Sequence, residues 1–114
     1  MNVWLETRFE NVGKERWNAL ISQNETNTIF QTYEWHYTWW KVFGMDKELF
    51  LVCVEDKNSL IGLAPLMICR NENGKKVLRF IGHGRADYTD FIYLDKEILD
   101  QIFESKWNDE LYHP

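Results

Sequence analysis

The sequence contains few of the residues that mark cross-linked or multidomain proteins. It has two cysteines, Cys53 and Cys69, and two prolines, one of which is the final residue. Two isolated cysteines form neither a metal quartet nor a disulfide framework, and both lie in apolar, strand-like runs, so we expect buried, reduced thiols. No Gly/Ser-rich linker, low-complexity stretch or internal repeat interrupts residues 1–114, which predicts a single domain.

Clustered positive charge and long apolar segments are also scarce. The 13 Lys and Arg residues face 18 Asp and Glu residues, and the densest basic site is the pair Lys75-Lys76. Nucleic acid is therefore not an expected partner. The longest mostly apolar run, 60–69, is too short to span a bilayer and contains Pro65, and the first residues lack a signal-peptide layout. We expect a soluble, cytoplasmic protein.

Helical spacing dominates the first part of the chain. A short strand over Val3–Phe9 is expected to precede a helix that Asn11 caps and that ends near Gln23. Thr32 and Glu34 then supply a cap and a first-turn acid for a second helix, which Gly44 ends. The apolar positions expected to face the core are, on the first helix, Trp17, Leu20 and Ile21 and, on the second, Trp35, Trp39, Val42 and Phe43.

From Leu49 the pattern becomes that of strands. Runs over 49–54 and 60–68 predict an antiparallel hairpin, in which Pro65 should leave its strand bulged or unpaired on one side. Asn73-Gly74 predicts the next turn, followed by strands over 75–81 and 91–94. Asp95 then caps an expected last helix with the inward residues Ile98, Leu99, Ile102 and Phe103.

The predicted order, β-α-α-β-β-β-β-α, places helices against one twisted, mostly antiparallel sheet, which is an α+β fold rather than a doubly wound one. After the last expected helix, residues 107–114 begin what reads as another extended segment and then stop. This ending predicts that the chain is an incomplete part of a longer protein.

Several motifs occur together in a familiar order. They are FQTYEW at 30–35, WW at 39–40, LIGLAPL at 60–66, RFIG at 79–82 and DYTD at 87–90. In this order the chain resembles the N-terminal part of the CelD-like branch of the GNAT acyltransferase superfamily, which is related to the Fem-type aminoacyltransferases. Members are longer and have two GNAT-like halves, so the resemblance implies a GNAT-like N-terminal half, inactive alone, of an N-acyltransferase.

The resemblance also implies a cofactor and a substrate. Acetyl-CoA or another acyl-CoA is the expected donor for the full-length family, and an amine of a sugar, peptide or metabolite is the expected acceptor. The donor loop of such enzymes, Gln/Arg-x-x-Gly-x-Gly/Ala, is matched literally by residues 79–84, from Arg79 to Gly84. A helix should follow that loop to complete an anion site, but residues 85–94 carry no apolar helical stripe. A glycine-permitted turn between strands is the alternative, and we expect no complete coenzyme A site in this chain.

Three residues of the same segment are assigned to the acceptor instead. The carboxylates of Asp87 and Asp90 would repel pyrophosphate but would help to hold a cationic amine. We therefore predict Asp87, Tyr88 and Asp90 as substrate-binding residues. The alternative roles of this loop are a metal site formed by His83, Asp87 and Asp90, which has only three ligands, and tight turns stabilised by the two carboxylates.

Other chemical candidates are weaker. Glu34 and His36 can be considered as general bases for an attacking amine, although a first-turn acid and an ordinary helix residue explain them more simply. Trp40 is the tryptophan expected to be exposed, and thus the candidate for stacking on a ligand. No residue is assigned as catalytic and no metal is expected. The competing interpretation is a non-catalytic binding or scaffold domain, and the expected protein partners are a missing C-terminal half or a second copy of the chain.

Overall fold

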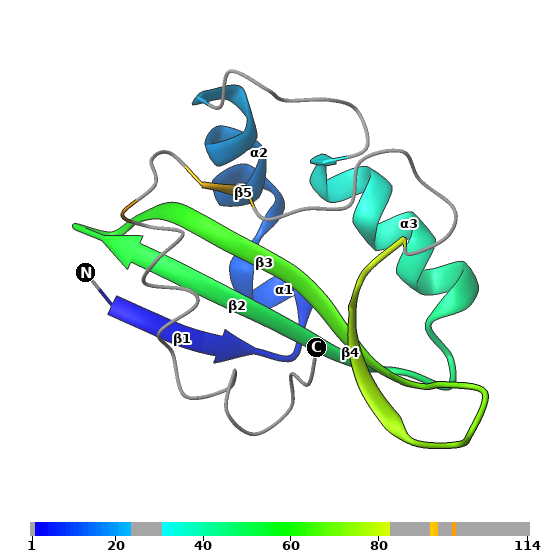
Figure 1. Cartoon of the computed structure of the whole chain (residues 1–114). Coiled ribbons are helices and arrows are strands. Elements are labelled where there is room, and N and C mark those ends of the chain that lie inside the picture. The colour runs from blue at the N-terminus through cyan, green and yellow to red at the C-terminus, as the bar shows by residue number, and fades with distance from the viewer. Residues whose placement is uncertain (1, 24–30, 83–91, 94–96, 98–114) are drawn as a thin grey trace.

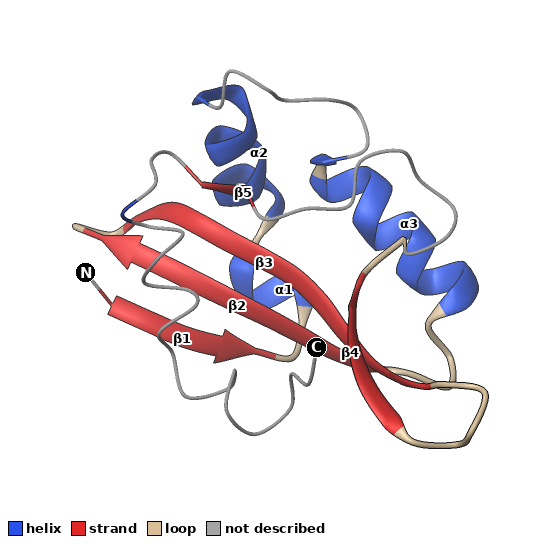
Figure 2. Ribbon diagram, viewed as in Figure 1, coloured by secondary structure: helices blue, strands red, loops and turns tan. Residues whose placement is uncertain are grey.

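The computed structural model describes residues 2–23, 31–82, 92–93 and 97 (Figure 1). Within them the fold is α+β, as predicted, with the helices preceding most of the sheet. The elements are β1 (Asn2–Glu6), α1 (Phe9–Val12), α2 (Lys14–Gln23), α3 (Tyr33–Phe43), β2 (Glu48–Asp56), β3 (Ser59–Arg70), β4 (Lys76–Phe80) and β5 (Ile92–Tyr93). The strand order is β1-β2-β3-β4, with β5 also paired to β3, and every pairing is antiparallel (Figure 2).

The first strand is shorter than predicted because Phe9 belongs to a helix. β1 ends at Glu6, whose carboxylate accepts hydrogen bonds from the Thr7 amide and the Asn11 side chain, both at 3.0 Å. Phe9 begins α1, and its ring stacks on that of Trp17 with 5.6 Å between centroids. The prediction of a strand through Phe9 is therefore wrong, because burial of an aromatic ring outweighs the local strand pattern.

The predicted first helix is divided in two at Gly13. Gly13 has a φ of 90°, a backbone conformation that residues with a Cβ rarely adopt, and α2 starts directly after it. Asn11 lies within α1, so its predicted role as the cap is wrong. The predicted inward positions are confirmed, since Trp17 and Leu20 are fully buried and Ile21 is nearly so.

Helix α3 begins and ends as predicted. The Thr32 hydroxyl accepts a hydrogen bond from the Trp35 amide at 3.3 Å, and the Gly44 amide donates to the Trp40 carbonyl at 2.8 Å. The predicted apolar face is wrong at Val42, which is 62% exposed, whereas His36 is buried. At 3.6 residues per turn Val42 lies about 120° around the helix from His36, so the buried face is centred between His36 and Phe43 instead.

The β2–β3 hairpin is the longest paired unit of the sheet. Its turn residues Lys57 and Asn58 both have positive φ, 51° and 67°, as a two-residue type I′ turn requires. Cys53 pairs with Leu63, so it does not face Cys69 across the hairpin. The bulge lies between Val54 and Glu55 rather than at Pro65.

The other edge of β3 is shared by two strands, and Pro65 lies between them. Among the described residues β4 pairs with β3 from Leu66 onward, and β5 pairs with Gly62 and Leu63. Ala64 and Pro65 thus fall between the two ladders, although the Pro65 carbonyl still accepts a hydrogen bond from the Ile81 amide at 2.9 Å. Among the residues that the structure describes, this strand is incompletely paired on one side, as predicted from the missing N–H of proline.

The remaining strand predictions are met within the residues that can be described. The Asn73-Gly74 turn joins β3 to β4, and the Asn71 side chain accepts hydrogen bonds from two amides of this turn. Strand β4 spans Lys76–Phe80, within the predicted 75–81, and β5 lies within the predicted 91–94. Apart from Glu97, the helix expected from Asp95 and the segment 107–114 lie outside the described residues.

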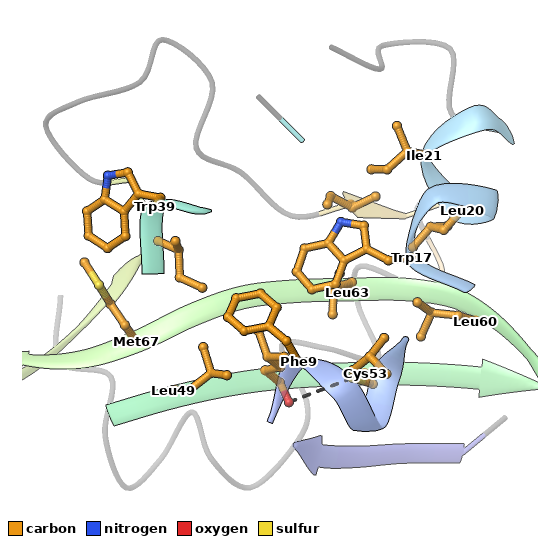
Figure 3. Packing of buried hydrophobic residues seen from close by; sticks show 14 of the residues in the cluster. Phe9, Trp17, Leu20, Ile21, Trp39, Leu49, Cys53, Leu60, Leu63 and Met67 are labelled. Carbon is orange, nitrogen blue, oxygen red and sulfur yellow. Dashed lines mark hydrogen bonds between the residues drawn. The ribbon is translucent and has the colours of Figure 1, made fainter. Parts of the chain in front are cut away.

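The alternation of side chains gives the sheet two buried faces. Helices α1 to α3 cover one face (Figure 1), where Trp17, Phe9 and Trp39 pack with Leu51, Cys53, Leu63 and Met67 of the strands (Figure 3). On the opposite face Phe50, Val52, Val54, Ala64 and Leu66 form a second cluster. None of the helices in the described ranges is long and apolar enough to cross a membrane.

We predict that Trp17→Ala lowers the free energy of unfolding by about 3–5 kcal/mol, because it removes a fully buried ring. The indole also donates a hydrogen bond to the Gln31 carbonyl at 2.8 Å, which the alanine leaves unpaired. Val42→Ala, on the exposed side of α3, should change stability by less than about 0.5 kcal/mol. Urea unfolding followed by circular dichroism measures both, and equal losses for the two variants would contradict the packing described.

We also predict that both thiols are free and that Cys53 is unreactive in the folded protein. Neither Cys53 nor Cys69 forms a disulfide, and burial raises the pKa of Cys53 to about 12. DTNB should therefore react slowly with Cys53 in the native protein and should titrate two thiols after denaturation without reductant. A disulfide-bridged mass, or fast reaction of Cys53 in the native state, would show that the register of β2 and β3 is different.

Candidate functional site

The predicted acceptor residues fall in a part of the chain that is not described. Asp87, Tyr88 and Asp90 lie outside the described residues, as do His83 and Gly84, so their roles remain predictions. Arg79 and Gly82, from the start of the same motif, are described. Gly82 is buried and has a φ of 91°, which agrees with a glycine-permitted turn after β4.

A pocket lies between the C-terminal half of α3 and the edge of the sheet formed by β3 and β4. We call it the α3–β4 pocket, and its volume is about 240 Å³. Its lining residues are Trp39, Phe43, Lys47, Met67, Cys69, Arg70 and Arg79. Three cationic residues thus meet three large apolar ones, and none of the described residues that line the pocket carries a carboxylate.

Strand register explains how a charged residue reaches this pocket. Leu49 pairs with Met67, and Met67 pairs with Arg79, so the three residues form one row across β2, β3 and β4. Leu49 and Met67 belong to the core on the helix-covered face. Arg79 therefore stands at the edge of that face, where the alternation calls for an inward side chain. It is partly buried there.

The three cations differ in how far they are already engaged. The Lys47 ammonium donates to the Phe43 carbonyl at 2.9 Å and to the Asp46 carboxylate at 2.7 Å. That ammonium holds the pKa of Asp46 below its usual value. Arg70 is exposed and donates to the Gly74 carbonyl at 2.7 Å.

Arg79 makes no hydrogen bond or ion pair with another described residue, so its guanidinium is the least committed cation of the pocket. Trp39 belongs to the apolar wall of the pocket and is 7% exposed. Figure 3 shows its benzene ring toward Met67 and its nitrogen on the far side. That Nε1 is buried without a hydrogen-bond partner.

The environments of Glu34 and His36 disfavour either as a general base. His36 is 3% exposed, and its ring lies 5.1 Å from that of Trp17 and 5.2 Å from that of Trp35. Its Nδ1 lies 2.9 Å from the Thr32 carbonyl, which can only accept, so Nδ1 carries the proton. Burial lowers the pKa of His36 to about 4. Glu34 is exposed, and the hydrogen bond from the Asn18 side chain lowers its pKa.

The structure also describes the surroundings of Trp40 and of Cys53. Trp40 is partly buried and packs against the core, so the prediction that it is an exposed stacking residue is wrong. Cys53 is fully buried with a raised pKa, which excludes it as a thiolate nucleophile in this state. Within the part of the chain that is described, no group of His, Cys, Asp or Glu side chains could hold a metal ion.

The sequence motifs do not indicate this pocket. No motif surrounds Lys47 or Arg70, and Arg79 is the first residue of the loop motif at 79–84. The available signal was the alternation in KVLRF at 76–80, which places Val77 and Arg79 on the same face of the strand. That alternation places Arg79 on the helix-covered face only when the register of β4 against β3 is also known.

Comparisons with known proteins add no relative to this description. A scan against models of protein families, a search of curated proteins and a search of solved structures each found no match for the chain.

The buried His36 predicts an acid-sensitive fold. Its pKa is about 4 in the folded protein and near 6.5 when exposed, so the unfolded state binds a proton first as the pH falls. The contribution of neutral His36 to the free energy of unfolding is fully present above the pKa of the unfolded state. It decreases as the pH falls toward the pKa of the folded state. Between about pH 7.5 and pH 5 this one group should lower the free energy of unfolding by about 2 kcal/mol.

The matched variant is His36→Asn, whose side-chain amide retains a donor near the Nδ1 position but does not titrate in this range. Urea unfolding at several pH values should give a steeper loss of stability for the natural chain than for the variant. Parallel pH profiles for the two proteins would show that His36 is not buried as described.

Proposed function

We propose that this chain is the GNAT-like, N-terminal half of an acyl-CoA-dependent N-acyltransferase that modifies an amine of a sugar, peptide or metabolite. The half is inactive alone. The positions in the fold of the motifs that carry the resemblance support this proposal. The aromatic helix α3 and the hairpin that contains Gly62 and Pro65 pack into one core, and β4 ends at Phe80, two residues before Gly82.

The two described residues that precede the proposed acceptor segment, Ile81 and Gly82, lie next to the sheet. Ile81 follows β4 directly; it is fully buried, and its amide donates a hydrogen bond to the Pro65 carbonyl. The residues that follow include Asp87, Tyr88 and Asp90, which we propose as the acceptor site. Acetyl-CoA or another acyl-CoA would then be bound mainly by a C-terminal half, or by a second copy of the chain. We propose the cytoplasm as the location, since both described cysteines are reduced.

One observation favours the competing function, a non-catalytic binding or scaffold domain. Among the described side chains, His36 and Cys53 are buried, and Glu34 has a lowered pKa. None of these three is suited to deprotonating an amine or to forming an acyl-enzyme near neutral pH. Binding of an acceptor amine distinguishes the two functions, because a scaffold domain is not expected to bind an amine more tightly than its acylated form.

We predict that the isolated chain binds an amine but not the acyl donor. Isothermal titration with acetyl-CoA should show no saturable binding at micromolar concentrations. In a panel of an amino sugar, a diamine and a short peptide with a free N-terminus, at least one amine should bind, and its N-acetylated form should not. Asp87→Asn with Asp90→Asn should weaken that binding about tenfold or more, because a hydrogen bond to a charged group contributes about 1.5–3 kcal/mol.

Two results would overturn this proposal in different ways. A one-to-one acetyl-CoA isotherm that Gly84→Asp abolishes would show that the chain carries its own cofactor loop. Failure of every amine in the panel, with the protein folded, would support the scaffold function instead.

A further inference from the structure

We propose that the α3–β4 pocket binds a small ligand in which a carboxylate or phosphate is attached to an aromatic or similarly flat apolar group. The assignment is independent of acyl transfer. It rests on the combination of one uncommitted arginine, two further cations and an apolar wall around a single cavity of about 240 Å³.

The charge around this pocket is opposite to that of the chain as a whole. The sequence has a net charge of -5, yet the charged residues that line the pocket are Lys47, Arg70 and Arg79. A concave site lined by one sign of charge focuses its potential and concentrates ligands of the opposite sign. An anion is therefore the expected ligand.

Arg79 is the group that would contact the anion. Its guanidinium offers several N–H donors in a planar fork, which matches the oxygens of a carboxylate or a phosphate. It is partly buried at the edge of the apolar face and has no described partner, so its interaction with an anion is less screened than at an open surface.

Arg70 contributes mainly through its electrostatic field, whereas the Asp46 carboxylate 2.7 Å from the Lys47 ammonium offsets much of the charge of Lys47. Each already donates to a backbone carbonyl, of Phe43 and of Gly74 respectively. The contact with Phe43 also matters because the C-terminus of α3 carries partial negative charge, which disfavours an anion nearby. Lys47 offsets that charge where α3 meets the pocket.

The apolar wall selects what is attached to the anion. Trp39 and Phe43 of α3 and Met67 of β3 supply the apolar lining of the pocket. Flat groups can stack on the aromatic rings and bury apolar area there. The cavity is smaller than the roughly 300–1,000 Å³ typical of drug-sized ligands, so a single ring with one anionic group is the expected size.

The expected preference for an anion is confined to the α3–β4 pocket, because a neighbouring cavity is lined by a different set of charged residues. It shares Cys69 and Arg70 with the α3–β4 pocket but is lined also by Asp46, Glu48, Ile68 and Lys76. Its two carboxylates would repel an anion. Arg70 lines both cavities, so the expected preference for an anion depends on Arg79 and the apolar wall.

The test uses four probes on the isotopically labelled chain: phenyl phosphate, benzoate, inorganic phosphate and phenol. Shifts of the Trp39 indole N–H signal in NMR titrations report binding. We expect phenyl phosphate or benzoate to bind saturably with a Kd of about 1 mM or tighter, and phosphate and phenol at least about tenfold more weakly. The stronger of the two aromatic probes identifies the anionic group.

Arg79→Gln should weaken the better aromatic probe about tenfold or more, and Arg79→Lys should weaken it less, because lysine keeps the charge but loses the fork. The matched control is Arg8→Gln, which removes an exposed arginine that does not line the pocket and should leave the Kd unchanged. Spectra of each free variant confirm that it is folded.

Three results would overturn the proposal. They are no saturable shift with either aromatic anion, equal affinity for phenol, and an unchanged Kd in both Arg79 variants. Each is independent of the amine and acetyl-CoA titrations, so the two proposals can fail separately.

Discussion

The β2–β3 hairpin is the constraint on which the other elements depend, because both of its faces are buried. Leu51 and Cys53 pack under the helices, while Val52 and Val54 pack on the opposite face. Each fully buried aliphatic side chain contributes roughly 1.5–3 kcal/mol relative to exposure, and a one-residue slip would exchange the two faces. The turn at Lys57-Asn58 and the pairing of β1 along β2 hold this register.

The hairpin also fixes where the candidate site forms. Because β3 is longer than β4, it accepts β4 along one part of its outer edge and β5 along another, with Pro65 between them. Helix α3 lies over the β4 end, and its length is set by Thr32 at one cap and Gly44 at the other. The α3–β4 pocket is therefore the gap left where a capped helix, an interior strand and an edge strand meet.

The correct predictions rest on residues close together in the sequence, whereas the errors come from packing between residues far apart in the sequence. The caps of α3 and the turn before β4 follow from residues a few positions apart, so the sequence alone located them. The helical state of Phe9 depends on rings from α2 and α3, and the burial of His36 depends on the side of α3 that meets Trp17. The pocket role of Arg79 depends on two strand registers at once, and the predicted acceptor residue Asp87 and its neighbours lie outside the described part of the chain.

Native-state hydrogen exchange tests the central position of the hairpin most directly. The account predicts that the slowest amides belong to the paired interior of β2 and β3, around Val52, Cys53 and Leu63, and that they exchange only through global unfolding. Amides of α2 and α3 should open at lower free energies. Slowest exchange in the helices, with the hairpin amides opening first, would contradict it.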